Sequence, residues 1–181
     1  MNEGLEIIGD TAFTHSNITT IIIPSTVRYI GSHSFAVCKE LESIEIPSSV
    51  TYLGESCFES CSKLKSVIIG KNISKIPKCA FLFCSNLNNA IILGEVTCFE
   101  QECFAFTKVT SFKFPQNTKC EYGSFKKNNI KMLDIGANTT ITFPEFESTS
   151  INVILKDNNK FLFAFNYCYR PKIDFFGFLF K

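Results

Sequence analysis

Cysteine is the residue whose number and spacing most strongly suggest chemistry in this chain. The sequence of 181 residues contains nine cysteines. Three pairs have the close spacing of metal ligands: Cys57-x3-Cys61, Cys79-x4-Cys84 and Cys98-x4-Cys103. A structural zinc site needs four ligands that converge in tetrahedral geometry, and a disulfide needs two cysteines in close approach. Either outcome depends on the elements that carry these cysteines.

The two histidines, His15 and His33, lie in no catalytic pattern. Neither has a Ser or Cys nucleophile at a motif spacing, and the sequence has no glycine-rich elbow. It also has no phosphate loop, dinucleotide fingerprint or paired-carboxylate pattern. We therefore expect both histidines at the surface, and we predict a protein that is not an enzyme and has no cofactor or metal.

The cysteines lie within a repeat of 21–23 residues that organises the chain. Its first column is phenylalanine: Phe13, Phe35, Phe58, Phe81, Phe104, Phe125 and Phe146. An L-x-x-I-x-I spacing follows each one and opens at Ile18, Leu41, Leu64, Leu87, Val109, Ile130 and Ile151. Alternating apolar residues predict a half-buried strand, which Pro24, Pro47, Gly70, Pro115 or Gly136 ends. One unit cannot bury its apolar face alone, so the units must stack.

Stacked units predict an α/β-type repeat, a solenoid with a parallel β-sheet on one face and short helical turns or loops on the other. The phenylalanines would form a continuous spine behind the sheet. Gly31 and Gly54 are expected to supply permissive turn angles. After the turn, an apolar column that includes Val27 and Val50 is replaced by Thr118 and Thr139.

Two regions are expected along the chain. Residues 1–156 form the repeat array of about seven units. Residues 157–181 form an aromatic-rich C-terminal segment, which is either a cap or a truncated continuation of the array. Within it Phe161, Phe163 and Phe165 alternate as in one more strand.

The repeat changes the interpretation of the cysteines. Cys38, Cys61 and Cys84 each follow a column phenylalanine by three residues, in units whose loop is one residue longer than in the others. In the shorter units the matching residues are Ser16, Thr107, Asn128 and Thr149. We interpret the extra residue as turning this position inward, where cysteine packs as a small hydrophobic side chain. Column neighbours in a ladder are about 5 Å apart, so oxidative pairing remains an alternative, and a metal site is another.

The composition describes a globular chain with little net charge. Apolar residues make up 45%, charged residues 19%, and the net charge is +1. This balance gives no reason to expect nucleic acid or an anionic membrane as partner. No apolar run reaches the length of a transmembrane helix, and the start MNEGLEIIGD predicts no signal peptide.

Residues between the inward-facing ones should face the open side of the sheet, where they form two stripes. The first stripe is Thr20, Ser43, Ser66, Asn89, Ser111, Met132 and Val153. The second is Ile22, Glu45, Ile68, Ile91, Lys113, Asp134 and Leu155. The first twelve of these residues along the chain, from Thr20 to Asp134, are the predicted partner-binding face, a shallow groove for a protein. The alternative is that they only reflect β-propensity at solvent-facing positions.

The repeat unit F-x-x-C-x-x-L-x-x-I-x-I-P-x-x-V-x-x-I-G resembles the Treponema-type leucine-rich repeat. Residues 30–93 match it closely, and residues 8–156 match it with decay. This is the repeat of BspA-like surface proteins of oral bacteria and of mucosal parasitic protists. The resemblance implies a leucine-rich-repeat solenoid and a surface antigen or adhesin that binds a host or matrix protein. The alternatives are an intracellular scaffold and a degenerate structural repeat without its own ligand.

Overall fold

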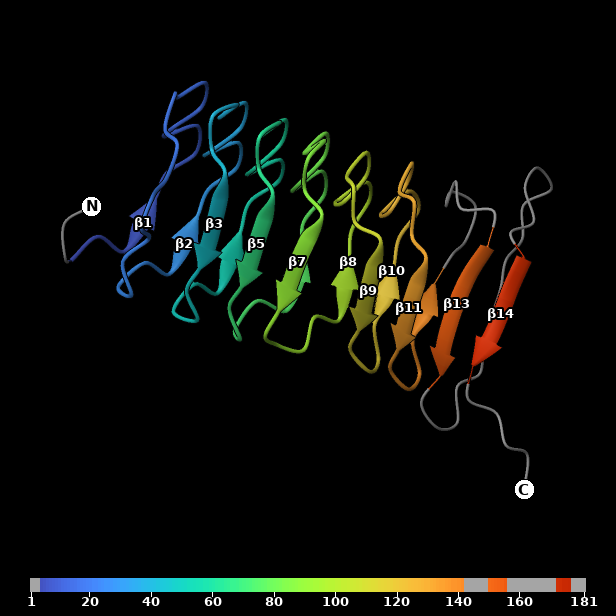
Figure 1. Cartoon of the computed structure of the whole chain (residues 1–181). Helices are drawn as coiled ribbons and strands as arrows, with labels where there is room; N and C mark the ends of the chain where they lie inside the picture. The colour runs from blue at the N-terminus through green and yellow to red at the C-terminus, as the bar shows by residue number, and fades with distance from the viewer. Residues whose placement is uncertain (1–3, 142–149, 156–171, 177–181) are drawn as a thin grey trace.

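The computed structural model describes residues 4–141, 150–155 and 172–176, which form a solenoid of stacked parallel strands (Figure 1). One row consists of the longer strands β3 (Ser43–Ile46), β5 (Ser66–Ile69), β7 (Asn89–Ile92), β9 (Ser111–Phe114), β11 (Met132–Ile135), β13 (Ser150–Leu155) and β14 (Lys172–Phe176). The other consists of two-residue strands: β1 (Ile7–Ile8), β2 (Tyr29–Ile30), β4 (Tyr52–Leu53), β6 (Lys75–Ile76), β8 (Cys98–Phe99), β10 (Lys119–Cys120) and β12 (Thr140–Ile141). The leucine-rich-repeat-like solenoid expected from the repeat is therefore present.

The long strands pair so that the columns of the repeat stay aligned. In β3 and β5, Ser43 is the register partner of Ser66 and Glu45 that of Ile68. The same columns match between β5 and β7 and between β9 and β11. β14 also pairs in parallel with β13, while the predicted strand around Phe163 lies outside the described residues. Side chains of one sequence column thus form one stripe on the sheet.

The second row of strands was not predicted. Ile30, Leu53 and Ile76, which follow the turn in their units, lie in β2, β4 and β6. Parallel pairing joins β1, β2 and β4, and separately β6, β8, β10 and β12. Two residues are too short to show an alternation of apolar and polar positions, so this ladder has no periodic signal in the sequence.

The predicted helical turns are wrong: the described residues contain no helix. In the first return segment, the Phe13 N–H donates to Ser34 O in the next coil at 2.7 Å, whereas the Thr14 N–H donates back to Thr11 O at 3.1 Å. Thr11 and His15 have φ angles of 57° and 61°, which interrupt any right-handed helix. Alternate N–H groups therefore bond between coils, and the segments stack as ladders of turns.

The glycines have a different role from the one expected. Gly31 and Gly54 do not have positive φ angles; that conformation falls on other residues, such as Val37 at 59°. A Cβ atom on Gly70 would lie 2.6 Å from Pro47 C in the preceding coil. Glycine is therefore needed because adjacent coils approach too closely for a side chain.

The core behind the sheet is the predicted phenylalanine spine. Rings stack from Phe13 through Phe35, Phe58, Phe81 and Phe104 to Phe125, with centroid separations of 5.1, 5.2, 5.4, 4.9 and 5.5 Å. Phe146 lies outside the described residues. The spine broadens where Phe99, Phe112 and Phe114 join Phe104 and Phe125 in a five-ring cluster. This cluster lies behind β9 and enlarges the core there.

The threonines of the post-turn column remain in the core. Thr118 and Thr139 are each 1% exposed. The Thr118 hydroxyl donates to Val96 O at 2.8 Å, and the Thr139 hydroxyl to Pro115 O at 2.9 Å. The column therefore continues with buried hydroxyls whose hydrogen bonds join neighbouring coils.

Candidate partner-binding face

The structure places the predicted partner-binding residues on the outer side of the long strands. Burial alternates along β3 and β9, with exposed residues between buried ones. Nine of the twelve side chains are exposed: Thr20, Ile22, Ser43, Glu45, Asn89, Ile91, Ser111, Lys113 and Met132. The others, Ser66, Ile68 and Asp134, are half-buried. Their common direction follows from the strand period, while their role in binding stays a prediction.

The first coil contributes to this face without a strand. Residues 18–23 have no strand conformation, so the strand predicted to open at Ile18 is wrong. The Glu42 N–H donates to Thr19 O at 3.1 Å, but no strand ladder between residues 20–23 and β3 follows it. Ile22 is nevertheless 86% exposed, the most solvent-exposed large apolar side chain of the described residues.

The sheet is interrupted at two places within residues 4–141, so the single sheet expected from the repeat is wrong. β3 has no pairing with the coil before it, and β9 has none with β7. Both unpaired strands are followed by proline, Pro47 and Pro115. β5, β7 and β11, which do pair with the preceding coil, are followed by Gly70, Leu93 and Gly136.

Proline lacks the amide hydrogen that two of the three paired strands use at this column. At the same column, the Leu93 N–H donates to Ile69 O at 2.9 Å and the Gly136 N–H to Phe114 O at 3.0 Å. These bonds close the end of each parallel pair. Pro115 cannot make the corresponding bond to β7. Ala90 of β7 and Phe112 of β9, a member of the five-ring cluster, both line this interval.

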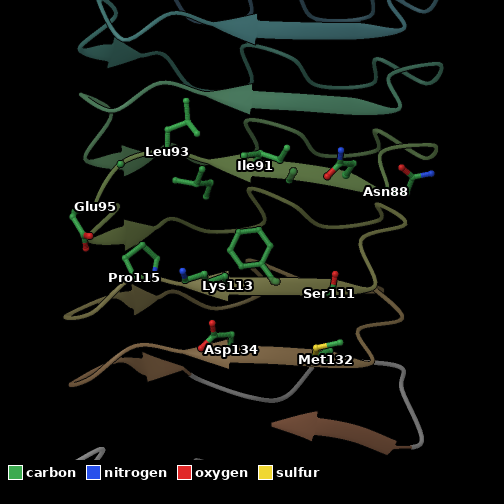
Figure 2. A pocket seen from close by; sticks show the side chains of 14 residues that line it. Asn88, Ile91, Leu93, Glu95, Ser111, Lys113, Pro115, Met132 and Asp134 are labelled. Atoms are coloured by element: carbon green, nitrogen blue, oxygen red, sulfur yellow. The ribbon is translucent and has the colours of Figure 1, made fainter. Parts of the chain in front are cut away.

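Each interruption forms a hollow on the outer face. The larger hollow, of about 520 Å³, lies between β7 and β9. In Figure 2 it is flanked by Ile91 and Leu93 on one side and by Lys113 and Pro115 on the other. The second, of about 400 Å³, lies between residues 20–23 and the Ser43–Pro47 segment. Sequence reasoning missed Leu93 and these hollows, although the two prolines were a usable signal.

Oppositely charged side chains pair between the segments that precede β3 and β5. The Lys65 ammonium donates to the Glu42 carboxylate at 2.9 Å, and this hydrogen bond lowers the pKa of Glu42. The Lys63 ammonium lies 2.6 Å from Glu40. These exposed pairs contribute little to stability. All four side chains lie outside the twelve residues of the predicted partner-binding face.

The cysteine column has a hydrogen-bonding role in addition to packing. Cys38, Cys61 and Cys84 are fully buried. Their thiols donate to the carbonyl oxygen of the column phenylalanine one coil earlier, Cys38 to Phe13, Cys61 to Phe35 and Cys84 to Phe58, at 3.0, 3.1 and 3.0 Å. Each thiol therefore joins two coils, a role that a small hydrophobic residue cannot fill.

The link between the longer loop and an inward orientation is wrong for two of the shorter units. Thr107 and Asn128 are 5% and 0% exposed, although their loops lack the extra residue. The Asn128 amide donates to Phe104 O at 2.8 Å, and the Thr107 hydroxyl to the Asn128 side-chain oxygen at 2.8 Å. The position therefore points inward in these units as well: Asn128 donates to the phenylalanine carbonyl one coil earlier, and Thr107 bonds to Asn128.

The environment of the cysteines suits packing. The eight described cysteines are free thiols, and Cys168 lies outside the described residues. Burial raises the pKa of the Cys38 thiol to about 11 and that of Cys84 and Cys103 well above the ordinary value. A buried, protonated thiol is a poor nucleophile. Across the described ranges, no three His, Cys, Asp or Glu side chains are grouped to hold a metal ion.

The described residues also include no helix of the length and apolar character that crossing a membrane requires.

Comparison with known proteins agrees with the repeat. Residues 6–132 match the BspA type Leucine rich repeat region in six copies. A leucine-rich repeat protein from Bacteroides ovatus, known from a crystal structure, is 16% identical with a TM-score of 0.48. The alignment covers 86% of this chain and 59% of that protein, so the chain spans less than two thirds of its length. No curated protein sequence matches this chain.

Proposed function

The chain belongs to the BspA-type leucine-rich repeat family, and from this we propose that it is a surface antigen or adhesin segment whose outer sheet face binds a host or matrix protein. Repeats of this kind typically serve protein interaction and are not catalytic. The proposal uses the predicted partner-binding face as its contact surface. The partner would contact both small polar side chains and isolated apolar side chains on several adjacent coils.

The observation that carries the proposal is the exposure of large apolar side chains on the outer face. Ile22 and Ile91 are 86% and 41% exposed, and Met132 is 46% exposed. Ile68, the register partner of Ile91, is half-buried beside it. Exposed apolar groups that alternate with polar ones are typical of protein-binding surfaces, because their burial contributes affinity while the polar groups fix orientation.

The test is binding of the intact chain to a panel of purified extracellular-matrix proteins, measured by surface plasmon resonance. A triple variant, Glu45→Ala, Ile68→Ala and Ile91→Ala, removes the centre of the face. We expect its affinity for the bound matrix protein to fall by about tenfold or more, as for loss of central interface residues.

A matched control replaces three residues on the other ladder. Tyr52, Lys75 and Lys119 are exposed residues of β4, β6 and β10. Their triple alanine variant should keep its affinity within about twofold. The proposal is wrong if no matrix protein binds, or if both triple variants lose affinity equally.

A further inference from the structure

We propose that the interval between β7 and β9 receives an extended peptide segment of the partner protein, which pairs through its backbone with both strands. This inference rests on the proposed function, because it assumes a protein partner, and it specifies how that partner binds. The interval is the 520 Å³ hollow of Figure 2.

The backbone groups of β7 that face the interval follow from its pairing with β5. The Leu93 N–H donates to Ile69 O at 2.9 Å, so Leu93 and Ile91 direct their N–H and C=O groups toward β5. Successive residues of a strand alternate in this direction in a parallel ladder. Ala90 and Ile92 therefore direct their N–H and C=O groups toward β9.

The same reasoning applies to β9. The Gly136 N–H donates to Phe114 O at 3.0 Å, so Phe114 and Phe112 direct their backbone groups toward β11. Ser111 and Lys113 consequently direct theirs toward β7. Two residues on each side of the interval thus offer one N–H and one C=O group each.

These groups have no backbone partner across the interval. In the described segment 88–115, β7 and β9 share no ladder pairing. Polar backbone groups need a partner or water, and the open hollow admits water. An extended peptide could replace that water, because it carries N–H and C=O groups at the same alternating spacing on both edges. Few other ligand classes match two facing strand edges.

The interval is bounded at both ends, which limits the length of the segment. On one side, the Lys108 N–H donates to Leu87 O at 2.8 Å. On the other, the Lys119 N–H donates to Thr97 O at 2.9 Å. Since β7 and β9 have four residues each, the paired part of the ligand is about four to six residues long.

The flanking side chains restrict the sequence of the ligand. Alternate ligand side chains would face inward beside Ala90 and the buried Phe112, which favours small apolar residues. The others would face outward between Ile91 and Lys113, where polar residues are compatible. The expected ligand is an alternating strand segment such as those this chain itself contains.

The probe is a synthetic peptide that copies residues 65–70, KSVIIG, with both ends blocked and a fluorophore attached. This segment contains β5, which already pairs with the opposite edge of β7. Binding to the full chain is measured by fluorescence anisotropy, and amide hydrogen exchange is followed by NMR. We expect saturable binding and slower exchange of the amides of Ala90, Ile92, Ser111 and Lys113.

Two N-methylated peptides distinguish insertion from addition to a free edge of the sheet. One lacks the N–H groups at the copies of Val67 and Ile69, and the other at the copies of Ser66 and Ile68. Insertion between two strands uses both edges of the peptide, so each analogue should bind at least about tenfold more weakly. If only one analogue is weakened, the peptide adds to a single edge and the inference is wrong.

A pair of variants separates backbone from side-chain recognition. Lys113→Pro removes an N–H group that faces the interval, whereas Lys113→Ala keeps it and removes only the charged side chain. We expect about a tenfold loss of peptide affinity for the first and less than about twofold for the second. Equal losses of peptide affinity in the two Lys113 variants would refute strand insertion, and so would the absence of any peptide binding. Neither result bears on the proposed matrix binding, which is tested separately through the triple variants.

Discussion

The two intervals beside β7 are built from the same repeat, yet only one is closed. Between β5 and β7 the strands pair over four register positions, from Ser66 with Asn89 to Ile69 with Ile92. Between β7 and β9 the strands are unpaired, although the phenylalanine rings behind them, Phe81 and Phe104, stack at 4.9 Å. Coil stacking and strand pairing are therefore separable in this solenoid. The phenylalanine rings stack across both intervals, whereas β9, which Pro115 follows, is unpaired with β7.

The largest expected effect comes from proline substitutions in the two intervals. Ile68 and Lys113 occupy the same column, but the Ile68 N–H lies in the ladder with β3 and the Lys113 N–H faces the open interval. We expect Ile68→Pro to lower the free energy of unfolding by about 3 kcal/mol, because a ladder bond is lost and a carbonyl is left unpaired. Lys113→Pro should cost less than about 1 kcal/mol.

Urea denaturation of the two proline variants measures this difference, with Ile68→Ala and Lys113→Ala as side-chain controls. Equal destabilisation by the two prolines would mean that β9 is paired with β7 in solution. The two intervals beside β7 would then not differ in strand pairing.

A smaller difference is expected between the donors that join the coils behind the sheet. Asn128→Ala removes the amide donor to Phe104 O and the acceptor of the Thr107 hydroxyl in a buried site, leaving only the 3.1 Å contact between Thr107 and Phe104 O. We expect it to lower the free energy of unfolding by about 2–3 kcal/mol. Cys61→Ala removes only a weak thiol donor and a small volume, so about 1 kcal/mol is expected.

Thermal or urea unfolding of both variants provides the measurement, and Cys61→Ser, which retains a donor, is the matched control. If Cys61→Ala destabilised the protein as much as Asn128→Ala, the thiol ladder would be as strong as the amide contact. The two regions of the spine would then be held together equally.

The smallest effect is expected for Pro115→Gly, which restores the N–H group found at Gly70 and Gly136. Its new hydrogen bond to Ile92 O would be offset by the greater freedom of glycine in the unfolded chain, so stability should change by less than about 1 kcal/mol. Amide exchange at Lys113 should nevertheless slow as the interval closes. Pro47→Gly is the control, since it lies beside the other hollow and should leave exchange at Lys113 unchanged.

Several features could be predicted because they depend on residue type at a fixed period. Repeated phenylalanine predicts the stacked spine, and the alternation around Ile44 and Val67 predicts buried strand positions, both of which are observed. The outward direction of Glu45 and Ile91 follows from the same alternation. These predictions held because burial of a side chain is largely decided by its own strand.

Other features depend on hydrogen-bond partners in the neighbouring coil. For these features the sequence pattern gave a wrong prediction or none. The return segments were expected to be helical, but residues such as Thr11 adopt positive φ and donate their own N–H groups to the next coil. The two-residue strands have no period to detect. Asn128 was grouped with outward-facing residues, although the Phe104 carbonyl holds it inside.

The sequence by itself determined the repeat, the spine and the two outward stripes, because apolar side chains at a regular period must be buried together. Only the tertiary structure decided where the sheet is continuous, because a ladder hydrogen bond needs a donor on one coil and an acceptor on the next. Pro115 lacks one such donor, and β9 shares no ladder pairing with β7. The open interval between β7 and β9 lies beside this proline, within a regular repeat.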